Sequence, residues 1–268
     1  MLKHFRTISS VALLMMVFVS CKKEAVNETQ QLEVTDEVVA SISKLGFSTH
    51  NIMAAEGGYV VEGDIFIPSN ELNRSLTGAI VRVGESEQYR TTNLVTGLPR
   101  VITVSVDSKL SSKYVNATDQ AILRYNGENL QITFQRVASG GNIVIKSAPR
   151  SAQYLASAGF PTAQGNPHNS ILVNNWYMDR NGWDGGTLVS VLAHEIGHCI
   201  GFRHTDYMDR SYSCGGGPSN EGASTVGAIH IPGTPTDQDP KSWMLACIGK
   251  GVDRPFNNND IIALSYLY

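Results

Sequence analysis

Residues 194–204 of this 268-residue chain read His194-Glu195-Ile196-Gly197-His198-Cys199-Ile200-Gly201-Phe202-Arg203-His204. On a helix, His194 and His198 are one turn apart and project from the same face. Gly201 then allows a positive φ, so the helix can end there and the chain can turn. On a continued helix His204 would fall on a different face, whereas the turn brings it back. The stretch therefore predicts a helix over residues 186–201 and a sharp return behind it.

The three histidines in this stretch indicate a metal site. Three protein ligands with a fourth position left for water are typical of catalytic zinc, whereas structural zinc sites are closed. Glu195 lies beside the first histidine and can reach a zinc-bound water without being a ligand. We therefore expect His194, His198 and His204 to bind Zn²⁺, with Glu195 as the general base.

This pattern resembles the metzincin clan of zinc endopeptidases, and the HEIGH spelling is most similar to the bacterial HEIGH-type metallopeptidases. The resemblance covers roughly residues 95–268. It implies an α/β (α+β) fold: a twisted mixed sheet with a backing helix, a zinc-site helix and a small irregular C-terminal subdomain. It also implies a methionine turn beneath the zinc, for which Met244 is the candidate. Ala246 stands where some metzincins carry a tyrosine.

The activity implied by the resemblance is hydrolysis of peptide bonds in extracellular proteins, through a zinc-bound water activated by Glu195. Two other classes stay open. One is a surface lipoprotein that binds a polymer and has a structural or vestigial zinc site. The intact Glu195 argues against it, because a structural site has no use for a base. The other is a zinc hydrolase of non-peptide bonds, which the ligands alone do not exclude.

The N-terminus has the features of an export signal. Lys3 and Arg6 precede an apolar run over residues 11–19, which is too short to span a bilayer as a helix. Ser20-Cys21 then resembles the end of a bacterial lipoprotein signal, in which the cysteine is lipidated. We expect residues 1–20 to be the signal peptide. A lipid on Cys21 is then the only expected attachment to the outer membrane or cell surface. Later processing that releases the protein is an alternative.

Upstream of the histidines, Glu62-Gly63-Asp64-Ile65 resembles the pro-segment motif of astacin-type metzincins. That resemblance implies that Asp64 occupies the open zinc position and keeps the enzyme latent. The alternative is that Gly-Asp only forms a turn between two short strands. We accordingly expect a tether and pro-segment over residues 21–92, cut near Arg90, and a catalytic domain over residues 93–268.

Several other patterns predict regular structure. We expect helices over residues 33–45, from Ser111 or Ser112 to 125, and over 260–268, the last capped by Asn259 or Asp260. We expect strands over residues 59–67 with a break, and over 100–107, 130–137, 142–145 and 170–173, with a linker over 71–93. Strand, helix, strand, strand in this order favours a mixed α/β sheet.

The remaining cysteines and histidines have lesser roles. After processing at Cys21, three cysteines are left, and we hypothesise that Cys214 pairs with Cys247. The histidines at positions 50, 168 and 230 lack partners at ligand spacing and are expected on the surface or in loops. Asp206 either orients a ligand imidazole or starts a turn.

Composition narrows the class of partner. The chain has 21 Lys and Arg against 24 Asp and Glu, and 42% of its residues are hydrophobic. A net charge of -3 argues against nucleic acid, because phosphate binding needs a basic face. The expected partners are protein or peptide substrates, and the expected state is a monomer.

Overall fold

The structure is a computed structural model that describes residues 32–72, 88–218, 220, 228–235 and 238–268. The expected signal peptide and the lipidation site Cys21 lie outside these residues. Within the described ranges, no helix combines the length and the apolar character that crossing a membrane requires.

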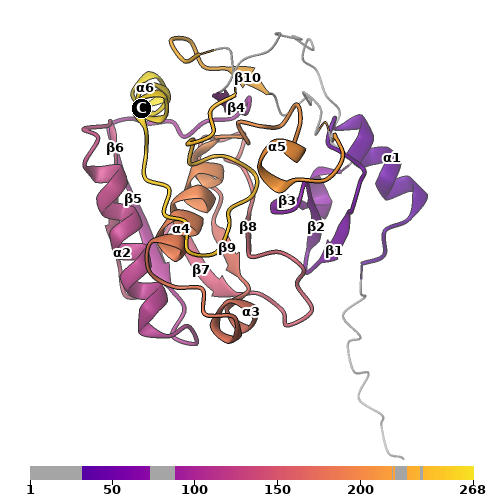
Figure 1. Ribbon diagram of the computed structural model, residues 1–268, viewed down its shortest axis with the longest axis horizontal. Helices are drawn as coiled ribbons and strands as arrows, with labels where there is room; N and C mark the ends of the chain where they lie inside the picture. The colour runs from indigo at the N-terminus through magenta and orange to yellow at the C-terminus, as the bar shows by residue number, and fades with distance from the viewer. Residues whose placement is uncertain (1–31, 73–87, 219, 221–227, 236–237) are drawn as a thin grey trace, which may run out of the picture. The chain divides into compact units, whose positions relative to one another are not determined.

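An eight-stranded sheet forms the centre of the fold, in the order β1-β2-β3-β8-β9-β7-β5-β6 (Figure 1). Pairing is parallel between β3 and β8 and along β9-β7-β5-β6, and antiparallel elsewhere. The predicted α/β class with a mixed sheet is therefore confirmed. The strands span Met53–Ala55 (β1), Gly58–Val61 (β2), Ile65–Pro68 (β3), Arg100–Val106 (β5), Ile132–Arg136 (β6), Ile143–Ser147 (β7), Ala156–Ala158 (β8) and Ser170–Val173 (β9).

Two long helices, α2 (Ser112–Asn126) and α4 (Gly185–Ile200), back the sheet. They contact each other and both contact the sheet, so they cover one face of it (Figure 1). The Tyr125 hydroxyl donates to the Ala193 carbonyl at 2.7 Å and ties the two helices together. Buried Ile102 and Val104 of β5 belong to the same core. This packing makes α4 a rigid support, which matters because α4 carries the first two histidines.

The N-terminal segment folds onto the same sheet. Helix α1 (Asp36–Lys44) is capped by Thr35, whose hydroxyl accepts from the Val38 amide, and a short 3-10 helix, η1 (Ser69–Glu71), follows β3. Seven residues form a small core of their own: Ile42, Leu45, Phe47, Tyr59, Val61, Ile65 and Ile67. Ile65 of β3 pairs with Ala158 of β8, so the β1-β2-β3 hairpins extend the larger sheet.

The segment predicted as a linker contains a short strand at its end. Strand β4 (Tyr89–Arg90) pairs with β10 (Ile229–His230). The Gln88 side chain donates to Ser242 and, at 2.6 Å, to Asp260. Residues 88–90 are thus bound to the C-terminal part of the chain. The domain boundary expected after residue 92 remains a prediction.

The C-terminal part is mostly irregular, as the resemblance implied. It contains α5 (Ser211–Cys214), β10 and α6 (Asn258–Leu267), and a disulfide joins Cys214 to Cys247. The cap expected at Asn259 or Asp260 is wrong. Asn257 caps α6 in a capping box, because its side chain accepts from the amides of both those residues while Asp260 accepts from the Asn257 amide.

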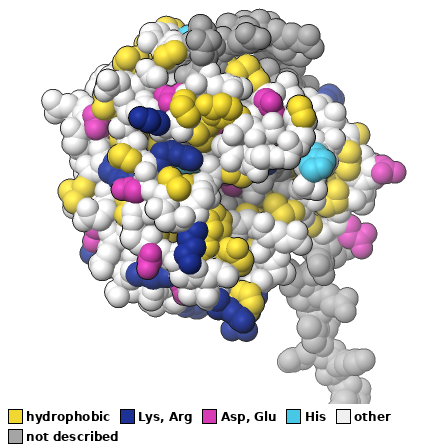
Figure 2. All heavy atoms as spheres, viewed as in Figure 1, with side chains coloured by type: hydrophobic (Ala, Val, Ile, Leu, Met, Phe, Trp, Pro, Cys, Tyr) yellow, Lys and Arg dark blue, Asp and Glu magenta, His cyan; other side chains and the backbone are white. Residues whose placement is uncertain are grey.

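The surface carries charges of both signs. On the face drawn in Figure 2, basic and acidic side chains are interspersed, and hydrophobic side chains reach the surface between them. Helix α3 (Asn175–Arg180), absent from the sequence-based expectation, contributes the exposed Trp176 and Tyr177.

Candidate metal centre

Helix α4 and the turn behind it position the three histidines. Gly201 ends the helix with φ 111°, in the left-handed region that favours glycine. The Phe202 amide then donates back to the Gly197 carbonyl at 2.9 Å, which closes the turn. His194 and His198 on the helix and His204 beyond the turn consequently face one another, all of them buried. This is the return that the Gly201 spacing predicts.

The three imidazoles converge on one point. Their ring centroids lie 4.6 Å apart for His194 and His198, 5.3 Å for His194 and His204, and 4.9 Å for His198 and His204. His194 Nδ1 lies 2.9 Å from the Trp243 carbonyl, and His198 Nδ1 lies 2.8 Å from the Phe202 carbonyl. A carbonyl only accepts, so both Nδ1 atoms carry hydrogen. In the neutral rings this leaves the Nε2 lone pairs directed at the shared point.

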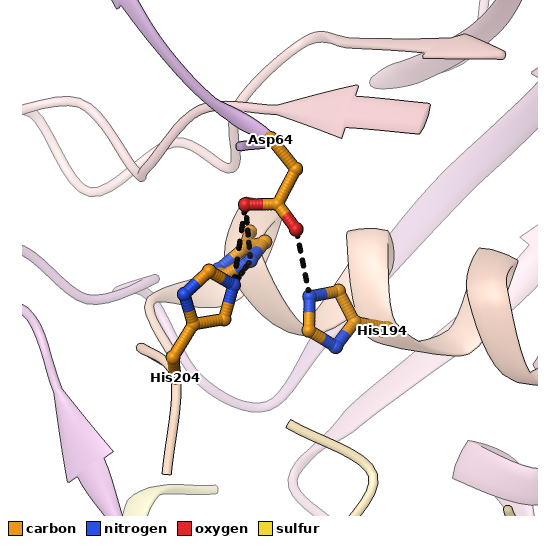
Figure 3. A group of neighbouring side chains, drawn as sticks. Asp64, His194 and His204 are labelled. Carbon is orange, nitrogen blue, oxygen red and sulfur yellow. Dashed lines mark hydrogen bonds and ion pairs between the residues drawn. The ribbon is translucent and has the colours of Figure 1, made fainter. Parts of the chain in front are cut away.

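Asp64 joins this cluster from the loop between β2 and β3 (Figure 3). Its Oδ1 lies 3.2 Å from His204 Nε2 and 3.9 Å from His198 Nε2, and its Oδ2 lies 3.5 Å from His194 Nε2. Burial raises the pKa of the Asp64 carboxyl, but attraction to the histidines in their charged form, His204 foremost, outweighs this and holds that pKa well below its usual range. Asp64 therefore faces the histidines as a carboxylate.

These four residues fit a bound cation. One ligand atom from each of them lies within 4.8 Å of the others. His194 Nε2 and Asp64 Oδ1 are buried and have no hydrogen-bond partner. Buried acceptors without donors are costly, and a metal ion at the shared point would satisfy them together.

Glu195 lies next to the cluster but outside the ligand set. Its side chain is buried, and its Oε2 has no hydrogen-bond partner. Burial and the negative charge of Asp64 raise the pKa of Glu195 well above its usual range. A carboxyl with a raised pKa next to a metal site suits proton transfer near neutral pH.

The turn around Met244 packs against helix α4. A Cβ on Gly197 would lie 2.6 Å from the Met244 sulfur, so the glycine allows the turn to approach α4 closely. The Thr205 amide donates to the Met244 carbonyl at 2.9 Å, next to the third histidine. The Trp243 carbonyl of the same turn contacts His194. The turn therefore contacts His194 on the helix before Gly201 and the residue next to His204 after it.

Asp206 supports this turn. Its Oδ1 accepts from the Ala246 amide at 2.9 Å, and its Oδ2 accepts from the Ser213 hydroxyl. That hydroxyl in turn accepts from the Cys247 amide at 2.9 Å, beside the Cys214–Cys247 disulfide. Asp206 thus joins the segment after His204 to the segment after Met244.

The remaining sequence candidates lie outside the cluster of the described residues. His168 is partly buried, and this burial lowers its pKa to about 4, while the His230 ring bonds to the Thr234 hydroxyl. His50 lies on the exposed surface. Cys199 is a buried free thiol whose pKa burial raises.

Sequence reasoning missed a buried ion pair behind the site. Arg203 Nη2 lies 2.7 Å from Glu62 Oε2, and both side chains are fully buried. The two residues flank His204 and the Asp64 loop. The local sequence gives no sign of this pair, because the partner of Arg203 lies 141 residues away along the chain.

Fold and site together define a metallopeptidase. The chain matches the family described as dual-action HEIGH metallo-peptidases over residues 59–268, which is most of its length, so the protein belongs to that family. Among solved structures, myroilysin is similar at 19% identity with a TM-score of 0.33. The match covers 43% of this chain and 54% of the myroilysin chain, about half the length of that relative. No curated protein matches.

Proposed function

We propose that the protein is an exported zinc endopeptidase of the metzincin type that hydrolyses peptide bonds of extracellular proteins. The observation that carries this proposal is the buried convergence of His194, His198 and His204, with Glu195 beside them and outside the ligand set. Asp64 adds a fourth ligand atom, as in a closed structural site, but a structural site has no use for the adjacent base that Glu195 provides.

His194, His198 and His204 would hold the zinc ion. When bound, zinc supplies a Lewis acid that polarises the scissile carbonyl and lowers the pKa of water. Glu195 accepts the proton of the attacking water at its free Oε2 and later returns it to the leaving nitrogen. The Trp243 and Phe202 carbonyls keep two of the imidazoles in the tautomer that binds metal.

The metzincin assignment is supported by the turn at Gly201 and by the position of Met244. Both features follow the clan pattern, and the Met244 carbonyl and the Trp243 carbonyl contact residues next to or within the ligand set. Ala246 leaves the tyrosine position of that pattern without a hydroxyl donor.

Latency through Asp64 is the second part of the proposal. Its carboxylate opposes all three imidazoles, and the Ala158 amide donates to its carbonyl at 3.0 Å, so this segment also occupies the edge of β8. Such an arrangement would block both the metal and the strand along which a peptide could pair. The cut expected near Arg90 would release the segment, and a cut there on the N-terminal side of Gln88 would leave β4 paired with β10.

Export as a lipoprotein completes the proposal. Its support is the basic and apolar N-terminus followed by Ser20-Cys21. Lipidation of Cys21 would hold a monomeric enzyme at the outer membrane or cell surface. Intact mass and N-terminal sequencing of the native protein test lipidation and any pro-segment cut together.

The activity is tested in the full chain carrying Asp64→Ala, to which Glu195→Gln is added or, as a matched control away from the site, Glu56→Gln. Glu195→Gln should retain zinc, measured as metal content, and lose about 10²- to 10⁴-fold in kcat on denatured casein or gelatin. A chelator should abolish cleavage by the Asp64→Ala protein. Full activity of Glu195→Gln would overturn the mechanism, and zinc binding without any cleavage would favour a structural site.

Latency is tested with Asp64→Ala against Glu56→Ala. We expect the first variant of the full chain to cleave casein before any processing, and the second to behave as the parent does. Equal initial rates for parent and Asp64→Ala would refute latency through the Asp64 carboxylate while leaving the peptidase proposal intact.

A further inference from the structure

A cavity of about 240 Å³ lies directly beside the metal centre. His194 and Glu195 line it, together with residues 245–247 of the turn after Met244. Much of its wall is apolar, including Leu155, Val191 and Leu245. A group bound here would lie next to the reacting bond, because the general base and one ligand belong to the wall.

Two arginines also line this cavity, Arg210 and Arg254. Arg254 is held in place at both ends. Its backbone amide donates to the Ser190 hydroxyl at 2.7 Å, and its Nη1 and Nη2 each donate to the Cys247 carbonyl at 3.2 Å. Its side chain is therefore fixed by a neutral acceptor, the Cys247 carbonyl.

Among the described residues, the charge of Arg254 has no ion-pair partner. Within the described residues, no carboxylate lies within 4.0 Å of its guanidinium. Burial lowers the pKa of Arg254, and the negative charges of Asp206 and Asp260, which act from farther away, offset this only in part. A guanidinium stays protonated in proteins, so the wall presents a partly desolvated cation that a planar carboxylate would match.

Arg210 adds a second cation at the side of the cavity occupied by the Asp64 loop. A Cβ on Gly63 would lie 2.1 Å from Arg210 Nη2, so the guanidinium lies against the backbone next to Asp64. Its Nε donates to the Cys214 sulfur at 3.3 Å, which ties it to the disulfide. The two arginines thus approach the cavity from two segments, α5 with its flank and the loop before α6.

We propose that this cavity binds a carboxylate of the substrate beside the scissile bond, with Arg254 as its main partner and Arg210 as the second. The proposal rests on the peptidase function proposed above. The carboxylate has two sources in a peptide: an Asp or Glu side chain, or the C-terminal carboxylate of a chain cut close to its end. Either source would make Arg254 and Arg210 determinants of specificity rather than of the hydrolytic step.

The experiment uses the full chain carrying Asp64→Ala and loaded with zinc, with Arg254→Gln, Arg210→Gln or Arg136→Gln added. Arg136 pairs with Asp119 on the surface and serves as a control for the loss of one positive charge. The substrates are a mixture of peptides with free C-termini and the same mixture amidated, with the cuts identified by mass spectrometry. Matched peptides with Asp, Asn, Glu, Gln or Leu next to the cut then give kcat/KM.

We expect acidic residues next to the cut, or cuts near a free C-terminus, to be enriched about 10- to 100-fold over their neutral counterparts. Arg254→Gln should remove most of this ratio and change cleavage of the Leu peptide less than about threefold, while Arg136→Gln should leave the ratio as it was. If the enrichment survives amidation, the bound carboxylate is that of the side chain. If amidation abolishes it, the bound carboxylate is that of the C-terminus.

Three results would overturn the proposal. Neutral and acidic peptides cleaved at equal rates refute the carboxylate assignment alone. If Arg254→Gln lowers kcat/KM equally for all peptides, the role of Arg254 is structural. The absence of cleavage of any peptide refutes the peptidase function, and this proposal with it.

Discussion

The buried pair of Glu62 and Arg203 offers a test of how the N-terminal segment is held to the metal site. Both side chains are fully buried, with 2.7 Å between Arg203 Nη2 and Glu62 Oε2. The guanidinium also lies over the rings of Phe47 and Tyr207, at 5.3 and 5.9 Å from their centroids. The Ser48 amide donates to the other Glu62 oxygen at 3.1 Å.

Glu62→Ala would leave the charge of Arg203 buried without this partner. Removal of one member of a buried ion pair costs about 3–5 kcal/mol of unfolding free energy, and loss of the bond from Ser48 acts in the same direction. Glu62→Gln keeps an acceptor and should cost about 1–3 kcal/mol. Glu62→Leu combined with Arg203→Met removes both charges, so the double variant should be more stable than Glu62→Ala.

Urea unfolding measures the loss of unfolding free energy, and amide hydrogen exchange shows whether β2 and β3, next to Glu62, open more readily. Glu56→Ala, an exposed carboxylate in the adjacent turn, is the control and should change stability by less than about 0.5 kcal/mol. A Glu62→Ala variant as stable as that control would refute the reasoning. So would a double variant less stable than Glu62→Ala, because the cost would then not come from an uncompensated charge.

Three further predictions follow from single features. Gly201→Ala should destabilise the protein by about 1–3 kcal/mol and weaken zinc binding through His204, because the φ of Gly201 is 111° and the new Cβ would meet Leu94 at 2.8 Å. Urea unfolding and metal titration measure the two effects, and unchanged zinc affinity would contradict the prediction. Removal of zinc by a chelator should lower Tm reversibly, because zinc at 1,000 times its Kd adds about 4 kcal/mol to the free energy of unfolding. An identical Tm with and without zinc would count against the site. Burial raises the pKa of Asp260 to about 7, above an unfolded value near 3.8. The contribution of Asp260 to the free energy of unfolding is therefore full below about pH 4, and up to about 4 kcal/mol is lost as the pH rises through 7. Unfolding of Asp260→Asn measured from pH 4 to 8 should lack this decline, and parallel curves for the two proteins would refute it.

Local features were predictable because they depend on neighbours in the chain. The strands β5, β7 and β9 and the helices α2 and α4 follow from alternation, helical periodicity and glycine stops, and all were expected within a few residues. The short elements β8, β10 and α3 were not expected, because strands of two to four residues and single helical turns carry too little pattern. The cap at Asn257 was missed because two neighbouring residues of α6 have equally good capping side chains.

The sequence by itself determined the spacing of His194, His198 and His204 and the turn at Gly201, because a helix repeats every 3.6 residues and glycine alone enters the left-handed region easily. Only the tertiary structure decided that Asp64 faces these histidines, that Glu62 pairs with Arg203 across 141 residues, and that Arg210 and Arg254 share a cavity with Glu195. Such contacts depend on which strands pair and in what register, here β3 with β8 and β4 with β10. No local periodicity specifies that pairing, because it is set by the packing of side chains from the whole chain.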